Sequence, residues 1–194
     1  MSRLIVLLAA GASSRMRGGD KLLEEVEGQP LLRLLAERCT KAGETRVVLG
    51  PNQPARRAAL DGITAEIVEA EGDDGMAASI RAGVAGLRNT SVMIVLADMP
   101  DITAGDLHLL LGLHGQGIAP IVQAASDTGT PGQPVVFAPK YLKHLAKLQG
   151  DEGARSILKA HARDVALIPL KDDRATVDLD TPEDWATWRA QRSS

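Results

Sequence analysis

The stretch LIVLLAAGASSRMRGGDK, residues 4–21, decides the fold of this chain of 194 residues. It opens with an unbroken apolar run that ends at Ala10. Such a run is typical of a buried parallel strand. Glycine, serine and arginine then follow as far as Lys21, a composition typical of a loop. The pattern predicts a strand over residues 4–9 that leads directly into a loop of small and cationic residues.

Outward from this stretch, apolar strand-like runs alternate with helical patterns. Further strands are expected over residues 46–50, 63–68, 92–97, 119–124, 135–137 and 165–170. Helices are expected over residues 31–42, 56–60, 76–87, 103–114, 140–148, 154–162 and from 181 onward. Residues 128–134 are expected to form a loop. Alternating strands and helices form a mostly parallel sheet with helices on both faces. The prediction is one domain, residues 1–194, built as a three-layer α/β sandwich around a Rossmann-like sheet.

Composition narrows the class of protein. Lys plus Arg is 22 and Asp plus Glu is 25, a net charge of −3, which argues against a nucleic-acid binder. Aromatic residues are only 2%, so stacking platforms for single-stranded nucleic acid are not expected either. The single cysteine, Cys39, has no partner in the chain for a disulfide, which favours a reducing compartment.

The N-terminus allows two interpretations. Residues 2–10 resemble a short secretory signal, but the apolar run is only seven residues long. That run is also far short of the ~20 residues that span a bilayer. A buried strand is the favoured interpretation, and the expectation is a cytoplasmic protein with no membrane segment.

Three loops should meet at one edge of the sheet. They are residues 10–21, 70–75 and 98–101, and each follows a predicted strand. Ligands bind beyond the carboxyl ends of the strands in such sheets. In the first loop, successive N–H groups between small residues can bind an anion, and Arg15 and Lys21 add two cations. The alternative is a flexible surface turn with solvated cations. Neither a P-loop nor a G-x-G-x-x-G motif is present.

Six segments, in order along the chain, carry a resemblance to one family. They are LAAGASSRM with Lys21 (residues 8–21), GMAASIRAG (75–83), LADMP (96–100), GQPVVF (132–137), GDEGAR (150–155) and VDLDTPED (177–184). Together they resemble the nucleotidyltransferases of molybdenum-cofactor biosynthesis, and the second is similar to the molybdopterin cytidylyltransferase branch. The resemblance implies the nucleotide-diphospho-sugar transferase-like fold.

The resemblance also implies a nucleotide site. The triphosphate would be wrapped by Leu8, Ala9, Ala10 and Gly11 and held by Arg15 and Lys21, with Gly72, Gly75 and Ser79 near the base and ribose. Arg15, Lys21 and Asp98 would be the catalytic residues. A serine on a helix can instead bond its own backbone, which is the alternative for Ser79.

Carboxylates are needed because a triphosphate carries several negative charges, which a hard cation neutralises. The resemblance assigns Mg²⁺ to Asp98 and Asp180, with Asp178 as a reserve ligand on the same face of an extended segment. Asp98 could alternatively be a turn residue, and Asp180 could cap the helix that follows it.

On the acceptor side, the resemblance points to Gly132, Pro134, Asp151 and Arg155. Asp151 and Arg155 are four residues apart, so a local ion pair is the alternative for them.

The leading hypothesis is transfer of CMP from CTP to the phosphate of a molybdopterin-type molecule, with release of pyrophosphate. Guanylyl transfer from GTP, or another phosphorylated acceptor, is the nearest alternative. A dinucleotide-binding oxidoreductase and a non-catalytic module that delivers the cofactor are the others. A transient contact with a molybdoenzyme or its chaperone is the only protein partner expected.

Overall fold

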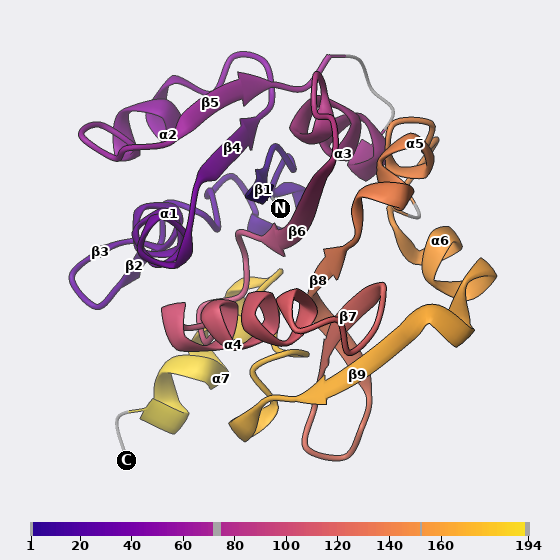
Figure 1. The fold of residues 1–194 in the computed structure, drawn as a ribbon. Coiled ribbons are helices and arrows are strands. Elements are labelled where there is room, and N and C mark those ends of the chain that lie inside the picture. Colours follow the sequence, from indigo (N-terminus) through magenta and orange to yellow (C-terminus); the bar gives the residue numbers. More distant parts are fainter. Residues whose placement is uncertain (1, 72–74, 152, 193–194) are drawn as a thin grey trace.

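The computed structural model describes residues 2–71, 75–151 and 153–192 and is built around a central sheet (Figure 1). Seven strands pair in the order β5-β4-β1-β6-β8-β7-β9. They are β1 (Ser2–Ala9), β4 (Thr45–Leu49), β5 (Glu66–Glu69), β6 (Thr90–Leu96), β7 (Ile121–Ala125), β8 (Pro131–Phe137) and β9 (Val165–Pro169). Within this sheet, the two pairings of β8 are antiparallel and the other four are parallel. The predicted three-layer α/β sandwich with a mostly parallel sheet is confirmed.

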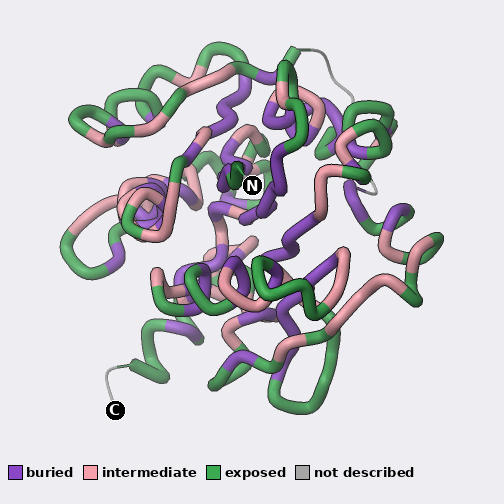
Figure 2. The backbone as a smooth tube through the Cα atoms, in the orientation of Figure 1, coloured by how far each residue is buried: buried purple, intermediate pink, exposed green. Residues whose placement is uncertain are grey.

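Helices cover both faces of this sheet (Figure 1). They are α1 (Leu31–Ala42), α2 (Pro54–Ala59), α3 (Gly75–Val84), α4 (Ala104–Gly115), α5 (Leu142–Leu145), α6 (Arg155–Ala160) and α7 (Pro182–Arg192). Alternate residues of β1 enter opposite cores: Ile5 and Leu7 pack with α1 and α4, whereas Leu4 and Val6 pack with α3. The buried strands therefore form the purple centre of Figure 2.

Two predicted helices are confirmed with their ends. The spacing of Leu31, Leu34 and Leu35 gives a buried stripe, and α1 spans the predicted residues. Thr103 caps α4, since its hydroxyl accepts from the Asp106 N–H while the Asp106 carboxylate accepts from the Thr103 N–H. This reciprocal pair satisfies two donors that the first helical turn leaves open.

Several predicted element bounds were wrong. The helix expected at 140–148 is reduced to α5, Leu142–Leu145, which follows a 3-10 helix at Pro139–Tyr141. The strand expected at 63–68 begins only at Glu66, because residues 60–65 form a turn closed by the Ile63 N–H to Leu60 carbonyl bond. The loop expected at 128–134 ends early, since β8 starts at Pro131. Proline is tolerated at the start of a strand, where its missing N–H costs little. A short hairpin, β2 (Glu25–Val26) and β3 (Gln29–Pro30), was not predicted.

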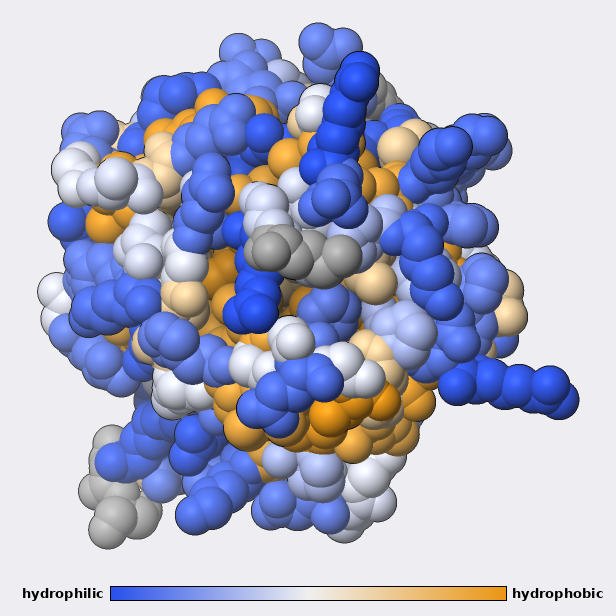
Figure 3. All heavy atoms as spheres, viewed as in Figure 1, coloured by the Kyte–Doolittle hydropathy of each residue, from blue (hydrophilic) through white to orange (hydrophobic). Residues whose placement is uncertain are grey.

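The surface is mostly hydrophilic on the face that Figure 3 shows, with hydrophobic atoms gathered in its lower middle. Large hydrophobic residues that remain exposed are Met76, Leu109, Ile118 and Leu167. Cys39 is fully buried, and burial raises the pKa of its thiol to about 12, which leaves it unreactive near neutral pH. Across the described residues, no helix has the length and apolar character that a bilayer crossing requires.

Candidate active site

The loop after β1 folds into a tight turn with a short 3-10 helix, η1 (Ser14–Met16), at its centre. Ser13 and Arg17 flank this helix, with φ values of 51° and 50°. Both lie in the left-handed region that non-glycine residues seldom adopt. Met16 is buried and anchors the turn to the core, while Arg15 and Arg17 stay exposed. The loop is thus a fixed structure that presents cations to one side.

A buried arginine holds this loop in place. The Arg56 guanidinium, only 3% exposed, donates to both carboxylate oxygens of Asp20 at 2.7 and 2.8 Å. It also donates to the Ala9 carbonyl at 2.6 Å and to the Ser13 hydroxyl at 3.0 Å. Burial alone would raise the pKa of Asp20, but the Arg56 and Leu22 N–H bonds lower it below its ordinary value. Arg56 therefore ties α2 to both ends of the loop.

Lys21 connects the loop to the acidic residues. Its ammonium group lies 2.6 Å from an Asp98 oxygen and 2.5 Å from an Asp180 oxygen. Burial disfavours the charge on Lys21, yet the two carboxylates outweigh this effect and raise its pKa. Arg15 reaches the other Asp180 oxygen at 2.5 Å. The structure thus brings the predicted loop cations together with both predicted metal ligands.

Three carboxylates converge at this point. One oxygen each from Asp98, Asp178 and Asp180 lies within 4.8 Å of the others. Asp98 Oδ1, the oxygen that does not bind Lys21, is buried and has no hydrogen-bond partner among the described residues. Burial, followed by the charges of Asp98 and Asp180, raises the pKa of Asp178. An unpartnered buried oxygen beside two more carboxylates suits a hard divalent cation.

Asp180 does not cap α7. Thr181 performs that role, because its hydroxyl accepts from the Asp184 N–H at 3.2 Å while an Asp184 oxygen accepts from the Thr181 N–H at 2.8 Å. The Asp180 side chain binds Arg15 and Lys21 instead. This excludes the helix-cap alternative for Asp180.

Among the residues predicted near the base, Gly72 lies outside the described residues. Gly75, with a φ of 55°, packs so closely on Asp151 that an added Cβ would lie 1.5 Å from a carboxylate oxygen. The structure therefore joins the start of α3 to the predicted acceptor loop. Ser79 is buried in α3 at 7% exposure, which leaves little of it accessible to a nucleotide.

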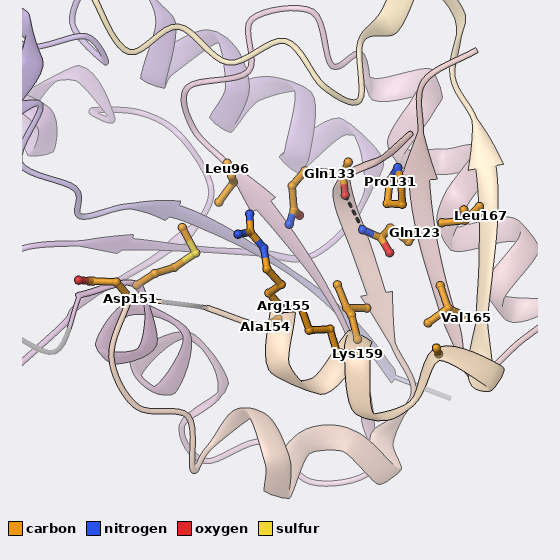
Figure 4. Close-up of a pocket in the computed structure, with 14 residues that line it drawn as sticks. Leu96, Gln123, Pro131, Gln133, Asp151, Ala154, Arg155, Lys159, Val165 and Leu167 are labelled. Atoms are coloured by element: carbon orange, nitrogen blue, oxygen red, sulfur yellow. Dashed lines mark hydrogen bonds between the residues drawn. The ribbon is translucent and has the colours of Figure 1, made fainter. Parts of the chain in front are cut away.

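Three of the four predicted acceptor residues line a cavity of about 660 Å³ between β8, β9 and α6 (Figure 4). Gly132, Asp151 and Arg155 line it, together with Leu96, which ends β6 two residues before Asp98. Pro134 is buried and stands outside the cavity wall. Among the described residues, Asp151 and Arg155 do not form the ion pair that their spacing suggested.

Gly132 has a structural role of its own. An added Cβ would lie 1.9 Å from the Ala175 carbonyl oxygen, so only glycine fits here. The neighbouring Gln133 N–H donates to the same oxygen at 2.8 Å. This contact brings the segment before Asp178 against β8.

The class of the protein follows from the positions of the loop and of Asp98 relative to the strands of the sheet. The loop follows β1 and Asp98 follows β6, at the carboxyl ends of two neighbouring parallel strands, in a sheet of the nucleotide-diphospho-sugar transferase-like type. Within that class, the chain belongs to the MobA-like NTP transferase family, whose domain matches residues 5–165. It is therefore a nucleotidyltransferase, and the resemblance seen in its sequence is confirmed. Asp178 and Asp180 lie beyond the matched range.

Named relatives extend over nearly the whole chain. The nicotine blue oxidoreductase of Paenarthrobacter nicotinovorans is 31% identical, with 92% of each chain covered. A molybdenum cofactor guanylyltransferase of Pseudomonas putida is 28% identical over 92% of this chain and 93% of that protein. The crystal structure of Rv0371c from Mycobacterium tuberculosis H37Rv is 26% identical, covers 100% of both chains and has a TM-score of 0.81. That protein was also crystallised in complex with manganese.

Proposed function

We propose that this nucleotidyltransferase transfers CMP from CTP to the phosphate of a molybdopterin-type acceptor and releases pyrophosphate. The observation that carries the proposal is the group formed by Lys21, Asp98 and Asp180 at the ends of β1 and β6. It places cations for a triphosphate beside carboxylates for a divalent cation. The cavity next to Leu96 supplies room for the acceptor.

In the reaction, a non-bridging oxygen of the acceptor phosphate attacks the α-phosphorus of CTP. A new P–O bond forms, the bond between the α-phosphorus and the bridging oxygen breaks, and pyrophosphate leaves with the electron pair. Arg15 and Lys21 would neutralise the oxygens of the leaving group, since charge-assisted bonds from cations are strong. Asp98 and Asp180, with Asp178 in reserve, would hold Mg²⁺, which lowers the charge repulsion between the two phosphates when bound.

Ligand binding must change the partners of the loop cations. Lys21 and Arg15 are both bound to Asp180 in the structure. A divalent cation would compete with them for the carboxylates, while the triphosphate would compete with the carboxylates for the cations. Nucleotide and divalent cation should therefore bind with positive cooperativity.

CTP is the proposed nucleotide because of the segment GMAASIRAG, residues 75–83. Gly75 packs closely on Asp151, so the start of α3 has little space for a side chain. A narrow slot suits a pyrimidine, and unpaired buried polar groups would penalise a wrong base. Several relatives are named molybdenum cofactor guanylyltransferases, so GTP is the nucleotide to exclude.

The test is pyrophosphate release with CTP, GTP and ATP, each with Mg²⁺, with Mn²⁺ and with a chelator. The acceptor is molybdopterin cofactor. A kcat/KM ratio for CTP over GTP well above one is expected. A ratio near or below one would overturn the choice of CTP and leave nucleotidyl transfer in place.

A second candidate, an oxidoreductase, is favoured by the name of the 31% identical relative. The sequence offers no G-x-G-x-x-G segment for a dinucleotide. Absorbance of NADPH, followed with and without candidate acceptors, tests this activity directly. Oxidation of NADPH without pyrophosphate release from CTP would replace the proposed function.

A further inference from the structure

The side chain of Gln53, between β4 and α2, connects the ends of two neighbouring strands. Its amide oxygen accepts from the Gly50 N–H at 2.8 Å, and its amide nitrogen donates to the Ala10 carbonyl at 3.0 Å. An amide side chain is required for this pair of bonds, because one end must accept and the other must donate. Gln53 therefore ties the backbone after β4 to the first residue of the loop after β1.

This connection lies where the pairing between β1 and β4 ends. The register of the two strands would next join the Gly50 N–H to the Ala9 carbonyl. Gln53 accepts from the first group instead, and Arg56 donates to the second at 2.6 Å. A Cβ on Gly50 would lie only 3.0 Å from the Ala10 carbonyl oxygen, so the two segments approach each other closely.

The two bonds orient the peptide groups at the start of the loop. The carbonyls of Ala9 and Ala10 both accept from side chains of the segment after β4, whereas consecutive carbonyls of an extended strand point to opposite sides. The N–H of a trans peptide group points away from its carbonyl, so the Ala10 and Gly11 N–H groups both point away from β4. Because β6 flanks β1 on the other side, they face the side of Asp98.

We infer that Gln53 is a positioning residue of the nucleotide site, which keeps the Ala10 and Gly11 N–H groups turned toward a phosphate oxygen of the triphosphate. Neither N–H has an acceptor among the described residues, and Gly11 is exposed. Two adjacent N–H groups that point the same way form a concave anion site. Without the bond from Gln53, the Ala10 carbonyl is free to rotate toward the phosphate and repel it. This inference rests on the proposed function, because it takes the loop as the triphosphate site.

The first experiment compares Gln53→Leu with the wild type by calorimetry, with Mg²⁺ and without an acceptor. The probes are CTP, GTP and inorganic tripolyphosphate, which has no base or ribose and reports on phosphate contacts alone. The variant should bind all three about tenfold more weakly, as expected for the loss of one hydrogen bond to a charged group. The control is Gln29→Leu, which removes a half-buried glutamine bonded to Glu37 on α1 and should leave binding unchanged.

The second experiment uses Gln53→Glu, which keeps an acceptor for the Gly50 N–H but loses the donor to the Ala10 carbonyl. Protonation of the new carboxylate restores that donor. The ratio of variant to wild-type Kd for tripolyphosphate should therefore be large at about pH 8 and shrink as the pH falls toward about 4.5, near the ordinary pKa of glutamic acid. Arg56 and Asp20, the charged pair beside this position, keep their charges over this range, because the pKa of Asp20 is lowered.

The matched control for the added charge is Asn52→Asp, at the exposed neighbouring position. Its Kd ratio measures the effect of the charge alone and should stay within about twofold, because solvent screens an exposed charge. A ratio for Gln53→Glu no larger than that of Asn52→Asp, or a large ratio that does not change with pH, would overturn the inference.

The outcomes separate the two proposals. A lower Tm of Gln53→Leu with unchanged tripolyphosphate binding would make Gln53 purely structural and would overturn the inference, whether or not CMP is transferred. If Gln53→Leu weakens tripolyphosphate binding as expected but the wild type transfers CMP to no acceptor, the proposed function fails while the positioning role of Gln53 stands.

Discussion

Cationic side chains are bound to carboxylates in one half of the sheet, whereas the cavity in the other half contains polar side chains without such partners among the described residues. Around β1, β4 and β6, cationic side chains in and beside the loop are paired: Arg56 of α2 binds Asp20, and Lys21 binds Asp98 and Asp180. In the cavity beside β8 and β9, the buried amide oxygen of Gln133 has no hydrogen bond and the exposed Arg155 has no ion pair, as far as the described residues go. In the first region, a ligand must displace existing ion-pair partners. In the second region, a ligand meets polar groups that have no such partners among the described residues.

This difference affects the free energy of ligand binding in the two regions. A paired site is stable without ligand, but an incoming charge must displace an existing one. An unpaired site has a stability cost and gains a hydrogen bond on binding. Four substitutions, taken from the largest expected effect to the smallest, test this contrast.

Asp98→Asn should have the largest effect, because it removes a charge where three carboxylates meet and keeps the shape of the side chain. Turnover should fall roughly 1,000-fold, the upper end of what one charge-stabilising group contributes. Pyrophosphate release measures it. Asp61→Asn, an exposed aspartate beyond α2, is the control. Turnover within a fewfold of wild type at low divalent-cation concentration would contradict the metal role of Asp98.

Arg56→Met tests the structural half of the paired region. Removing one partner of a buried ion pair costs about 3–5 kcal/mol, and we expect the lower end because Asp20 is 28% exposed. The adjacent Arg57 is a matched control, since it pairs with Glu69 at the surface and is 49% exposed. Arg57→Met should change the free energy of unfolding by about 1 kcal/mol or less. Urea unfolding measures both, and equal losses would refute the anchoring role of Arg56.

Lys21→Ala should weaken nucleotide binding or turnover about 10- to 150-fold, the equivalent of about 1.5–3 kcal/mol for a charge-assisted bond. It also leaves Asp98 and Asp180 without their shared cation. Divalent cation should therefore raise the Tm of this variant more than that of the wild type. A smaller rise in the variant would show that Lys21 and the cation do not compete. A large Tm loss with unchanged kinetics would make Lys21 purely structural.

Asp20→Asn should show the smallest effect, because the asparagine amide oxygen still accepts a hydrogen bond from Arg56, and it should show a characteristic pH dependence. The folded-state pKa of Asp20 is lowered, so its contribution to stability is complete above the pKa of an unfolded aspartate. That contribution is lost as the pH falls through the folded-state pKa. The Tm difference between wild type and variant should therefore be constant near neutral pH and shrink below about pH 4. A difference that persists unchanged at pH 3 would contradict the assignment.

Local patterns were enough to predict much of the fold. Leucine spacing gave the bounds of α1, and Thr103 gave the start of α4, because helix stripes and caps depend on residues close in sequence. The start of β8 was missed, because Pro131 and Gly132 are typical of loops and only pairing with β7 makes them a strand. Such pairing is a tertiary effect that a local pattern does not contain.

The site was predictable in its residue types and less so in its contacts. Arg15, Lys21, Asp98 and Asp180 were found through motifs, and the structure brings them together. Arg56 was missed, since one of two adjacent arginines on a short helix resembles a solvated surface residue. Its burial depends on how α2 packs against a loop 36 residues earlier. The unpaired state of Gln133 likewise depends on the cavity around it.

Lys21 and Asp180, which form an ion pair, are 159 residues apart in the sequence. During synthesis, the ribosome exposes the loop long before the carboxylate that completes the site. Until the segment around Asp180 leaves the exit tunnel, the nascent chain has a loop without its second acidic partner. Nucleotide binding should therefore begin only after the segment around Asp180 has been synthesised and has packed against the loop.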